Sequence, residues 1–171
     1  MKIGFIGLGN MGAPMAANLA KTHEVVGFDT HAAPAGLTLA DSAAAAAKDA
    51  DVVITMLPNG EILRAVANEI HPAMKPGAVH LDCSTVDVES ARAVAAQAEA
   101  AGLHAVDAPV SGGIGGATNG TLTFMAGGTA QAFATVQPLF DIMGQKAVHC
   151  GDAGNGQAAK ICNNMILGVT M

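Results

Sequence analysis

A glycine-rich turn near the start of the chain constrains its fold more than any other feature. Residues 2–7 form a short apolar run of strand length that leads into Gly7-Leu8-Gly9-Asn10-Met11-Gly12, and a helical stretch over about 11–21 follows. In this GxGxxG pattern the first glycine permits a tight turn, the second lets a ligand approach the backbone, and the third lets helix and strand pack closely. The motif therefore predicts a strand–turn–helix unit that binds the diphosphate of a dinucleotide at the helix N-terminus.

Further along the chain, apolar runs alternate with helical segments. The expected strands are residues 24–29, 51–57, 78–82, 103–107, 122–126 and 146–150. The expected helices lie near 40–49, 60–70, 86–101 and 130–143, and a last one starts after Gly156. A glycine-rich connection is expected over 111–116. Strands and helices at this spacing form βαβ units, so we predict an α/β fold of the Rossmann type, a doubly wound, mostly parallel sheet with helices on both faces.

The composition fits a globular domain with an aliphatic core. The chain has 171 residues, of which 51% are hydrophobic and 13% charged, with no Trp or Tyr. Its formal net charge of -6 argues against a broad contact with a phosphate backbone, so we expect no nucleic-acid partner. No apolar run approaches the roughly 18 residues of a membrane-spanning helix, so we expect no membrane partner. Three cysteines without a CxxC pair indicate reduced thiols and a cytoplasmic location.

A carboxylate closes the second expected strand. Asp29 lies 22 residues after Gly7, where dinucleotide-binding domains carry an acidic residue. It can accept a hydrogen bond from the 2′-hydroxyl of the adenosine ribose, and it repels a 2′-phosphate. The spacing therefore favours NAD over NADP, although a protonated His31 would weaken that repulsion.

Polar side chains and unhindered backbone follow two later strands, at the sheet edge where ligands gather in folds of this type. Ser84 and Thr85 carry hydroxyls suited to a nicotinamide amide or ribose, or alternatively they cap the next helix. Ser111, Gly112 and Gly113 offer a hydroxyl and successive N–H groups, which suit a carboxylate, and a plain turn is the alternative.

The last helix carries Lys160 and Asn164 four residues apart, hence on one face. Small and apolar neighbours surround the lysine. Partial burial would lower its pKa from ~10.4 toward about 7–8 and make it a proton acceptor at neutral pH, whereas a surface lysine is the alternative. Because the helix ends in an apolar segment over 165–171, we expect it to dock on a further domain or a partner chain.

Other chemistries lack their sequence signals. The six histidines are scattered, with no HxxxH and none beside a cysteine pair, so we expect no metal site. Neither a GxSxG elbow nor a GxxxxGK[ST] loop occurs, which excludes the common hydrolase and P-loop classes. Cys83 is interpreted as a small buried residue rather than a reactive thiol.

Four motifs in order make the chain resemble the β-hydroxyacid dehydrogenase family, and within it the members that act on 3-hydroxyisobutyrate. The motifs begin at Gly4, Asp107, Gly120 and Gly156 and read GFIGLGNMGAPMAANL, DAPVSGG, GTLT and GQAAKICNNM. They extend over nearly the whole chain, and together they are highly specific for that family.

The resemblance implies NAD-dependent oxidation of a short 3-hydroxy acid to its semialdehyde, by hydride transfer and without a metal. Lys160 would accept the hydroxyl proton or stabilise the developing alkoxide, and Asn164 would hold the substrate. Ser111, Gly112 and Gly113 would bind the substrate carboxylate. The implied cofactor contacts are Gly7, Leu8, Gly9, Asn10, Met11, Gly12, Asp29, Leu57, Pro58, Ile62 and Thr85.

Members of that family add a second, all-α domain through a long interdomain helix, and that domain supplies substrate contacts and most of a dimer interface. The resemblance therefore implies an NAD-binding domain over 1–155 and the start of the interdomain helix over 156–171. It also implies that the full-length enzyme is a homo-oligomer.

Two alternatives stay open. The same residues could run the reverse reaction in a reductase of tartronate semialdehyde or a related small aldehyde, and the chain alone could be a non-catalytic NAD-binding fragment. Asn163-Asn164 stands where 6-phosphogluconate dehydrogenases carry His-Asn, which argues against that sugar phosphate as substrate. Lys160 argues against imine-reducing relatives, which usually replace it.

Overall fold

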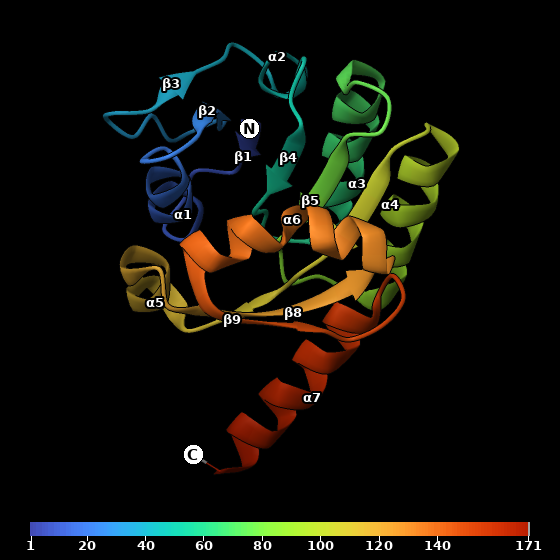
Figure 1. Cartoon of the computed structure of the whole chain (residues 1–171). Helices are drawn as coiled ribbons and strands as arrows, with labels where there is room; N and C mark the ends of the chain where they lie inside the picture. Colours follow the sequence, from blue (N-terminus) through green and yellow to red (C-terminus); the bar gives the residue numbers. More distant parts are fainter. Residues whose placement is uncertain (171) are drawn as a thin grey trace.

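The computed structural model describes residues 1–170, and a single sheet organises them (Figure 1). Met171, the last residue of the expected interdomain helix, lies outside the described residues. The strands are β1 (Lys2–Ile6), β2 (Glu24–Phe28), β3 (Thr38–Leu39), β4 (Val52–Thr55), β5 (Val79–Asp82), β6 (His104–Asp107), β7 (Val110–Ser111), β8 (Leu122–Gly128) and β9 (Gly144–His149). The helices are α1 (Gly12–Leu19), α2 (Ala43–Ala47), α3 (Gly60–Ile70), α4 (Val88–Ala100), α5 (Gly113–Asn119), α6 (Ala130–Met143) and α7 (Asn155–Thr170), with a short 3-10 turn over His71–Ala73.

The strand order is β3-β2-β1-β4-β5-β6-β8-β7, and β9 pairs with β8. All pairs from β3 to β6 are parallel, as is β8 with β9, whereas β8 runs antiparallel to β6 and to β7. The predicted doubly wound, mostly parallel sheet is confirmed. The chain moves outward from β1 to β2 and β3 and then returns past β1 to β4. This reversal opens a crevice at the carboxyl ends of β1 and β4.

Side chains alternate between the two faces of the sheet, and helices cover both. Ile3 and Phe5 of β1 belong to the larger core cluster, together with residues of α1 and α6. Ile6 belongs to a second cluster with residues of α2, α3 and α4. Every residue of β4 is buried, as expected for a central strand of a parallel sheet.

Four helices begin at a polar residue whose side chain accepts a hydrogen bond from the first turn. These N-caps are Ser42 for α2, Asn59 for α3, Asp87 for α4 and Thr129 for α6. Because Asp87 caps α4, the alternative that Ser84 or Thr85 caps this helix is wrong.

The structure differs from the sequence-based expectation at α5, at β3 and β7, and at α2. Residues 113–119, which overlap the expected glycine-rich connection, form α5, entered through Gly112 at φ 129° and closed by Gly120 at φ 64°. The two-residue strands β3 and β7 have no apolar run to mark them. Helix α2 is shorter than the expected 40–49, because Lys48 takes an extended backbone and Asp49 a positive φ of 58°.

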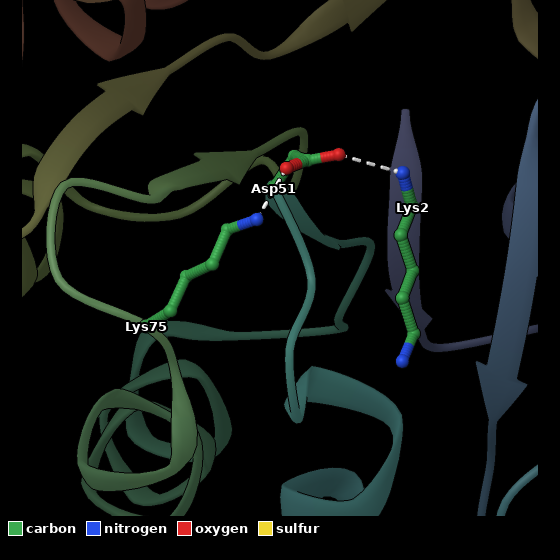
Figure 2. A network of polar contacts seen from close by, with 3 residues as sticks. All are labelled: Lys2, Asp51 and Lys75. Carbon is green, nitrogen blue, oxygen red and sulfur yellow. Dashed lines mark hydrogen bonds and ion pairs between the residues drawn. The ribbon is translucent and has the colours of Figure 1, made fainter.

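Asp51 connects three segments at the amino ends of β1 and β4 (Figure 2). Its Oδ1 pairs with the Lys75 ammonium, and its Oδ2 accepts the backbone N–H of Lys2 at 2.8 Å. The Lys75 contact, followed by the Lys2 N–H, lowers the pKa of Asp51. The side chains of Lys75 and Asp51 are 45% and 40% exposed, so the ion pair adds at most about 1 kcal/mol to stability. This network lies at the edge of the sheet opposite the crevice.

Candidate functional site

A cavity of about 450 Å³ opens at the carboxyl ends of β1, β2 and β4. It is bounded by the glycine-rich turn, the end of β2, the segment after β4 and one face of α3. The lining residues are Ile6, Gly7, Gly9, Asn10, Met11, Gly12, Phe28, Asp29, Thr30, His31, Met56, Leu57, Pro58, Ile62 and Val66. All of the expected cofactor contacts except Leu8 and Thr85 are among them.

Each glycine of the turn meets a different constraint. Gly7 has a φ of +93°, and a Cβ there would lie 2.3 Å from the Met56 carbonyl oxygen. A Cβ on Gly12 would lie 1.8 Å from the Gly7 carbonyl oxygen, so α1 packs directly on the turn. A Cβ on Gly9 would meet nothing within 4 Å. Packing therefore does not require Gly9, and its bare backbone borders open space that a ligand can enter.

Helix α1 starts at this turn without a side-chain cap. Its N-cap residue is Met11, no side chain accepts a hydrogen bond from the first turn, and no acidic residue occupies that turn. Free N–H groups and the positive end of the helix dipole stabilise a nearby anion. An open glycine backbone beside an uncapped helix therefore fits the diphosphate of a dinucleotide.

Asp29 lies directly after β2, where backbone N–H groups hold its carboxylate. Its Oδ2 accepts the Leu8 N–H at 2.6 Å, and its Oδ1 accepts the N–H groups of His31 and Ala32 at 2.7 and 2.9 Å. Burial opposes the charge, but the three donors outweigh it and lower the pKa of Asp29. The carboxylate is therefore ionised and fixed at neutral pH. Leu8 supports it through its backbone, while the Leu8 side chain is buried in the core.

The remaining wall of the cavity is apolar. Met56, Leu57 and Pro58 follow β4, while Ile62 and Val66 come from α3. Ile62 is 40% exposed although it is a large hydrophobic residue. An exposed apolar surface inside a cavity suits the flat face of an aromatic base.

Sequence reasoning did not assign six of the lining residues to the cofactor site. They are Ile6, Phe28, Thr30, His31, Met56 and Val66. Most of these directly precede or follow an expected site residue at a strand end. Val66 follows Ile62 by four residues on α3, and this helical spacing is the signal that could have found it.

The segment after β5 lies outside this cavity. Ser84 is fully buried, and its Oγ accepts the Leu57 N–H at 2.8 Å and donates to Asp82 Oδ1 at 2.6 Å. Its hydroxyl is thus used within the protein and is not available to a nicotinamide, contrary to the expectation from sequence. Thr85 is exposed, and its contact with the cofactor stays a prediction.

Asp82 is the first of four buried polar side chains joined by hydrogen bonds, and the last of them lies in the 3-10 turn after α3. Thr55 Oγ1 donates to Asp82 Oδ1 at 2.7 Å and lies 3.1 Å from His80 Nε2. His80 Nδ1 lies 2.9 Å from His71 Nε2. Burial lowers the pKa of His80 to about 3, so this imidazole is neutral at neutral pH. The four side chains therefore form a hydrogen-bonded network of neutral groups that ends at one carboxyl.

Asp82 makes the stability of the fold depend on pH. Burial raises its pKa from 3.8 to about 6, although hydrogen bonds from Ser84 and Thr55 oppose the shift. A carboxyl with a raised folded-state pKa stabilises the fold below about pH 4, and this contribution is lost as the pH rises through about 6. Asp82→Asn keeps the acceptor Oδ1 but cannot ionise. The wild type should lose stability between about pH 4 and about pH 8, and Asp82→Asn should not. We therefore expect the difference in free energy of unfolding, variant minus wild type, to increase by on the order of 2–3 kcal/mol over this range.

Chemical denaturation at the two pH values measures this difference. Asp41→Asn, at an exposed carboxylate, is the matched control, and its difference from the wild type should change far less. An effect of Asp82→Asn that is the same at both pH values would show that Asp82 titrates alike in the folded and unfolded chain.

The expected substrate-side residues lie on three elements that border β8, namely β7, α5 and α7. Ser111 ends β7, which pairs with β8, and Gly112 and Gly113 open α5 with φ values of 129° and 60°. Lys160 and Asn164 lie on α7, whose beginning packs on β8 while the helix projects away from the sheet (Figure 1). Lys160 is half-buried, and burial lowers its pKa, whereas Asn164 is exposed.

The described part of the chain also bears on the other sequence-based expectations. Within residues 1–170, no three His, Cys, Asp or Glu side chains gather as ligands for a metal ion. None of the helices in that range is both long and apolar enough to cross a membrane. Cys83 is fully buried, and burial raises its pKa, which confirms its interpretation as a core residue.

Known proteins resemble the chain in both sequence and structure. The family model for the NAD binding domain of 6-phosphogluconate dehydrogenase matches residues 2–151. The chain is 48% identical to a 3-hydroxyisobutyrate dehydrogenase and 46% identical to an NAD-dependent L-serine dehydrogenase, both of Pseudomonas aeruginosa. Each alignment covers 99% of this chain and 60% of the relative.

A solved structure of Mycobacterium tuberculosis 3-hydroxyisobutyrate dehydrogenase with L-serine is 47% identical to the chain. It superposes with a TM-score of 0.92 over 98% of this chain and 60% of that one. The chain thus spans about three fifths of the length of these relatives.

Proposed function

Because the chain belongs to the family of NAD-binding domains represented by that of 6-phosphogluconate dehydrogenase, we propose that it forms the cofactor-binding part of an NAD-dependent dehydrogenase for a short 3-hydroxy acid. One observation carries the proposal: an open glycine backbone, an uncapped helix N-terminus and a fixed carboxylate meet in one cavity. The first two fit a diphosphate, and the third fits the ribose diol. When bound there, NAD+ supplies the hydride acceptor.

Asp29 determines the choice between the two nicotinamide cofactors. Its ionised carboxylate can accept a hydrogen bond from the adenosine 2′-hydroxyl and repels a 2′-phosphate. Because Leu8, His31 and Ala32 hold it in place, it cannot turn away without losing hydrogen bonds. We therefore infer a preference for NAD over NADP.

Lys160 is the proposed proton acceptor of the reaction. In the oxidation of a primary alcohol, a hydride leaves the carbon and the hydroxyl proton must go to a base. The Lys160 amine is half-buried, and this burial lowers its pKa, which favours the neutral form that can accept a proton. Asn164 would hold the hydroxyl, and Ser111, Gly112 and Gly113 would bind the carboxylate through a hydroxyl and N–H groups.

The relatives point to two substrates of one chemical class. 3-Hydroxyisobutyrate and L-serine, which appear in the names of two similar proteins, are both 3-hydroxypropanoates that differ in the substituent on C2. We propose 3-hydroxyisobutyrate as the substrate, with L-serine as the second candidate. A reductase of tartronate semialdehyde would use the same groups in the reverse direction.

We further propose that residues 1–155 form the cofactor domain and residues 156–171 begin an interdomain helix, in a homo-oligomeric cytoplasmic enzyme. Exposed apolar side chains on α7, among them Met165, Ile166 and Val169, support docking of this helix on another folded unit. The three cysteines are free thiols, which is typical of a reducing compartment.

Reduction of NAD+ tests the proposed reaction. The protein is incubated with NAD+ and, in turn, 3-hydroxyisobutyrate, L-serine and 6-phosphogluconate, and formation of NADH is followed by absorbance. We expect turnover with the first acid, slower turnover with the second and none with the third. Preferred turnover of 6-phosphogluconate would overturn the substrate class. NAD+ binding without reduction by any acid would favour a non-catalytic NAD-binding module.

A further inference from the structure

A buried hydrogen-bonded joint fastens the first turn of α7 to the sheet. Asp107, at the end of β6, is only 5% exposed. Its Oδ1 accepts the Gly154 N–H at 2.7 Å, and its Oδ2 accepts the Gln157 N–H at 3.0 Å. The first N–H groups of a helix have no partner within the helix, and here a side chain from the sheet supplies one. The beginning of α7 is therefore fixed to the carboxyl end of β6.

The side chain of Gln157 extends this joint to the segment after β5. It is 1% exposed, its Oε1 accepts the Val86 N–H at 3.1 Å, and its Nε2 donates to the Ser84 carbonyl oxygen at 2.8 Å. Ser84 in turn accepts the N–H of Leu57, which lines the cofactor cavity. Hydrogen bonds thus lead from the wall of the cavity, through Ser84 and Gln157, to α7.

The joint leaves little room for movement. A Cβ on Gly156 would lie 2.4 Å from the carbonyl oxygens of both Asp107 and Met125. Beyond this first turn few protein atoms cover the helix, as the exposed fractions of Ile161 (47%) and Met165 (66%) show. The buried contacts of Gly156 and Gln157 therefore determine where the rest of α7 lies relative to the sheet.

Lys160 follows Gln157 by three residues, so the two side chains lie on neighbouring turns of one helix face. We propose that Gln157 is a positioning residue for Lys160, because its amide holds the helix that carries the amine at a fixed place relative to the cofactor cavity. This inference rests on the proposed function of Lys160. The inference adds to the site a residue whose amide oxygen and amide nitrogen each make a hydrogen bond within the protein.

Titration of the Lys160 amine tests the inference in the chain itself. Lysine amines carrying isotope-labelled methyl groups are followed by NMR as the pH is raised, and Lys160→Arg identifies the Lys160 signal. Gln157→Ala removes both amide bonds and loosens the turn, so we expect the Lys160 midpoint to rise by at least about half a unit. Asn155→Ala is the matched control. It removes a different first-turn contact, the bond to the Cys150 carbonyl at 3.2 Å, and should leave the midpoint unchanged.

Turnover gives a second test, because a general loss of stability would not lower kcat while leaving the Kd for NAD+ nearly unchanged. Gln157→Ala should lower kcat roughly 10-fold or more, because the base is misplaced, while the Kd for NAD+ stays within about three-fold. Gln157→Glu has nearly the shape of the wild type, and its protonated carboxyl can donate to the Ser84 carbonyl as the amide does. Its activity relative to wild type should therefore recover as the pH falls.

If Gln157→Ala does not fold, the Lys160 titration and the kinetic measurements are made on Gln157→Glu instead. A Lys160 midpoint that stays unchanged in the folded variant would overturn the positioning role. Full activity of Lys160→Ala would instead overturn the proposed function, so the two failures are distinguishable.

Discussion

Lys160→Ala is expected to lower kcat for oxidation of 3-hydroxyisobutyrate by at least about 100-fold, because acid–base groups contribute about 10²–10⁴ to the rate. The Kd for NAD+ should stay nearly unchanged, since Lys160 is not among the residues that line the cofactor cavity. Steady-state kinetics and an NAD+ titration on the same preparation measure both quantities.

Two further variants make this result specific. Lys160→Arg keeps the positive charge but cannot release a proton near neutral pH, so it should be almost as impaired as Lys160→Ala. Lys146→Ala, at an exposed position on β9, is the matched control and should keep wild-type activity. If Lys160→Ala turned over at the wild-type rate, a different group would have to accept the proton.

Gly9→Ala and Gly12→Ala should separate cofactor binding from folding. A Cβ on Gly9 meets no protein atom within 4 Å, so Gly9→Ala should be as stable as the wild type. Its methyl group would occupy the space that the diphosphate needs, and we expect NAD+ to bind roughly 100-fold more weakly, a loss of about 2.7 kcal/mol. A Cβ on Gly12 would lie 1.8 Å from the Gly7 carbonyl oxygen. Gly12→Ala should therefore lose about 3 kcal/mol or more of stability, because backbone must move.

Chemical denaturation and NAD+ titration of each variant provide the two measurements. Gly115→Ala, in α5, also meets nothing within 4 Å, so it should leave NAD+ affinity unchanged. Because alanine favours a helix over glycine, it should raise stability by up to about 1 kcal/mol. Wild-type NAD+ affinity in Gly9→Ala would mean that the diphosphate does not approach the chain at this glycine.

The parallel part of the sheet could be predicted because its signals are local. Apart from the two-residue β3, each strand from β1 to β6 contains a short apolar run. The glycine-rich turn, with Asp29 at the end of the second strand, predicts where the cofactor cavity forms. The structure confirms this part of the fold. The cavity residue Val66 was missed because an apolar residue on a helix is expected in the core rather than on a binding surface.

Helix α5 could not be predicted from its own residues, because Gly113, Gly115 and Gly116 disfavour a helix. A contact from a distant element stabilises it. Asn18 of α1 donates from its amide to the carbonyl oxygens of Ala117 and Thr118, at 2.9 and 3.3 Å, in the last turn of α5. These carbonyls would otherwise lack partners at the end of the helix.

The joint at the start of α7 was also beyond a reading of the sequence. Asp107 and Gln157 are 50 residues apart, and Gln157 and Ser84 are 73 apart, so no local pattern brings them together. The only local sign of a polar cluster in this region was an acidic residue at the end of each of two apolar strands, Asp82 and Asp107. Sequence reasoning placed both residues at strand ends but gave neither a role.

A calorimetric titration of the chain with NAD+ and, separately, with NADP+ tests the central claim most directly. The chain has no Trp, so calorimetry replaces the usual fluorescence quenching. We predict saturable binding of NAD+, with NADP+ at least about 10-fold weaker, a difference of about 1.4 kcal/mol. Tighter binding of NADP+ would contradict the role of Asp29, and failure of the folded chain to bind either cofactor would contradict the assignment of the cavity itself.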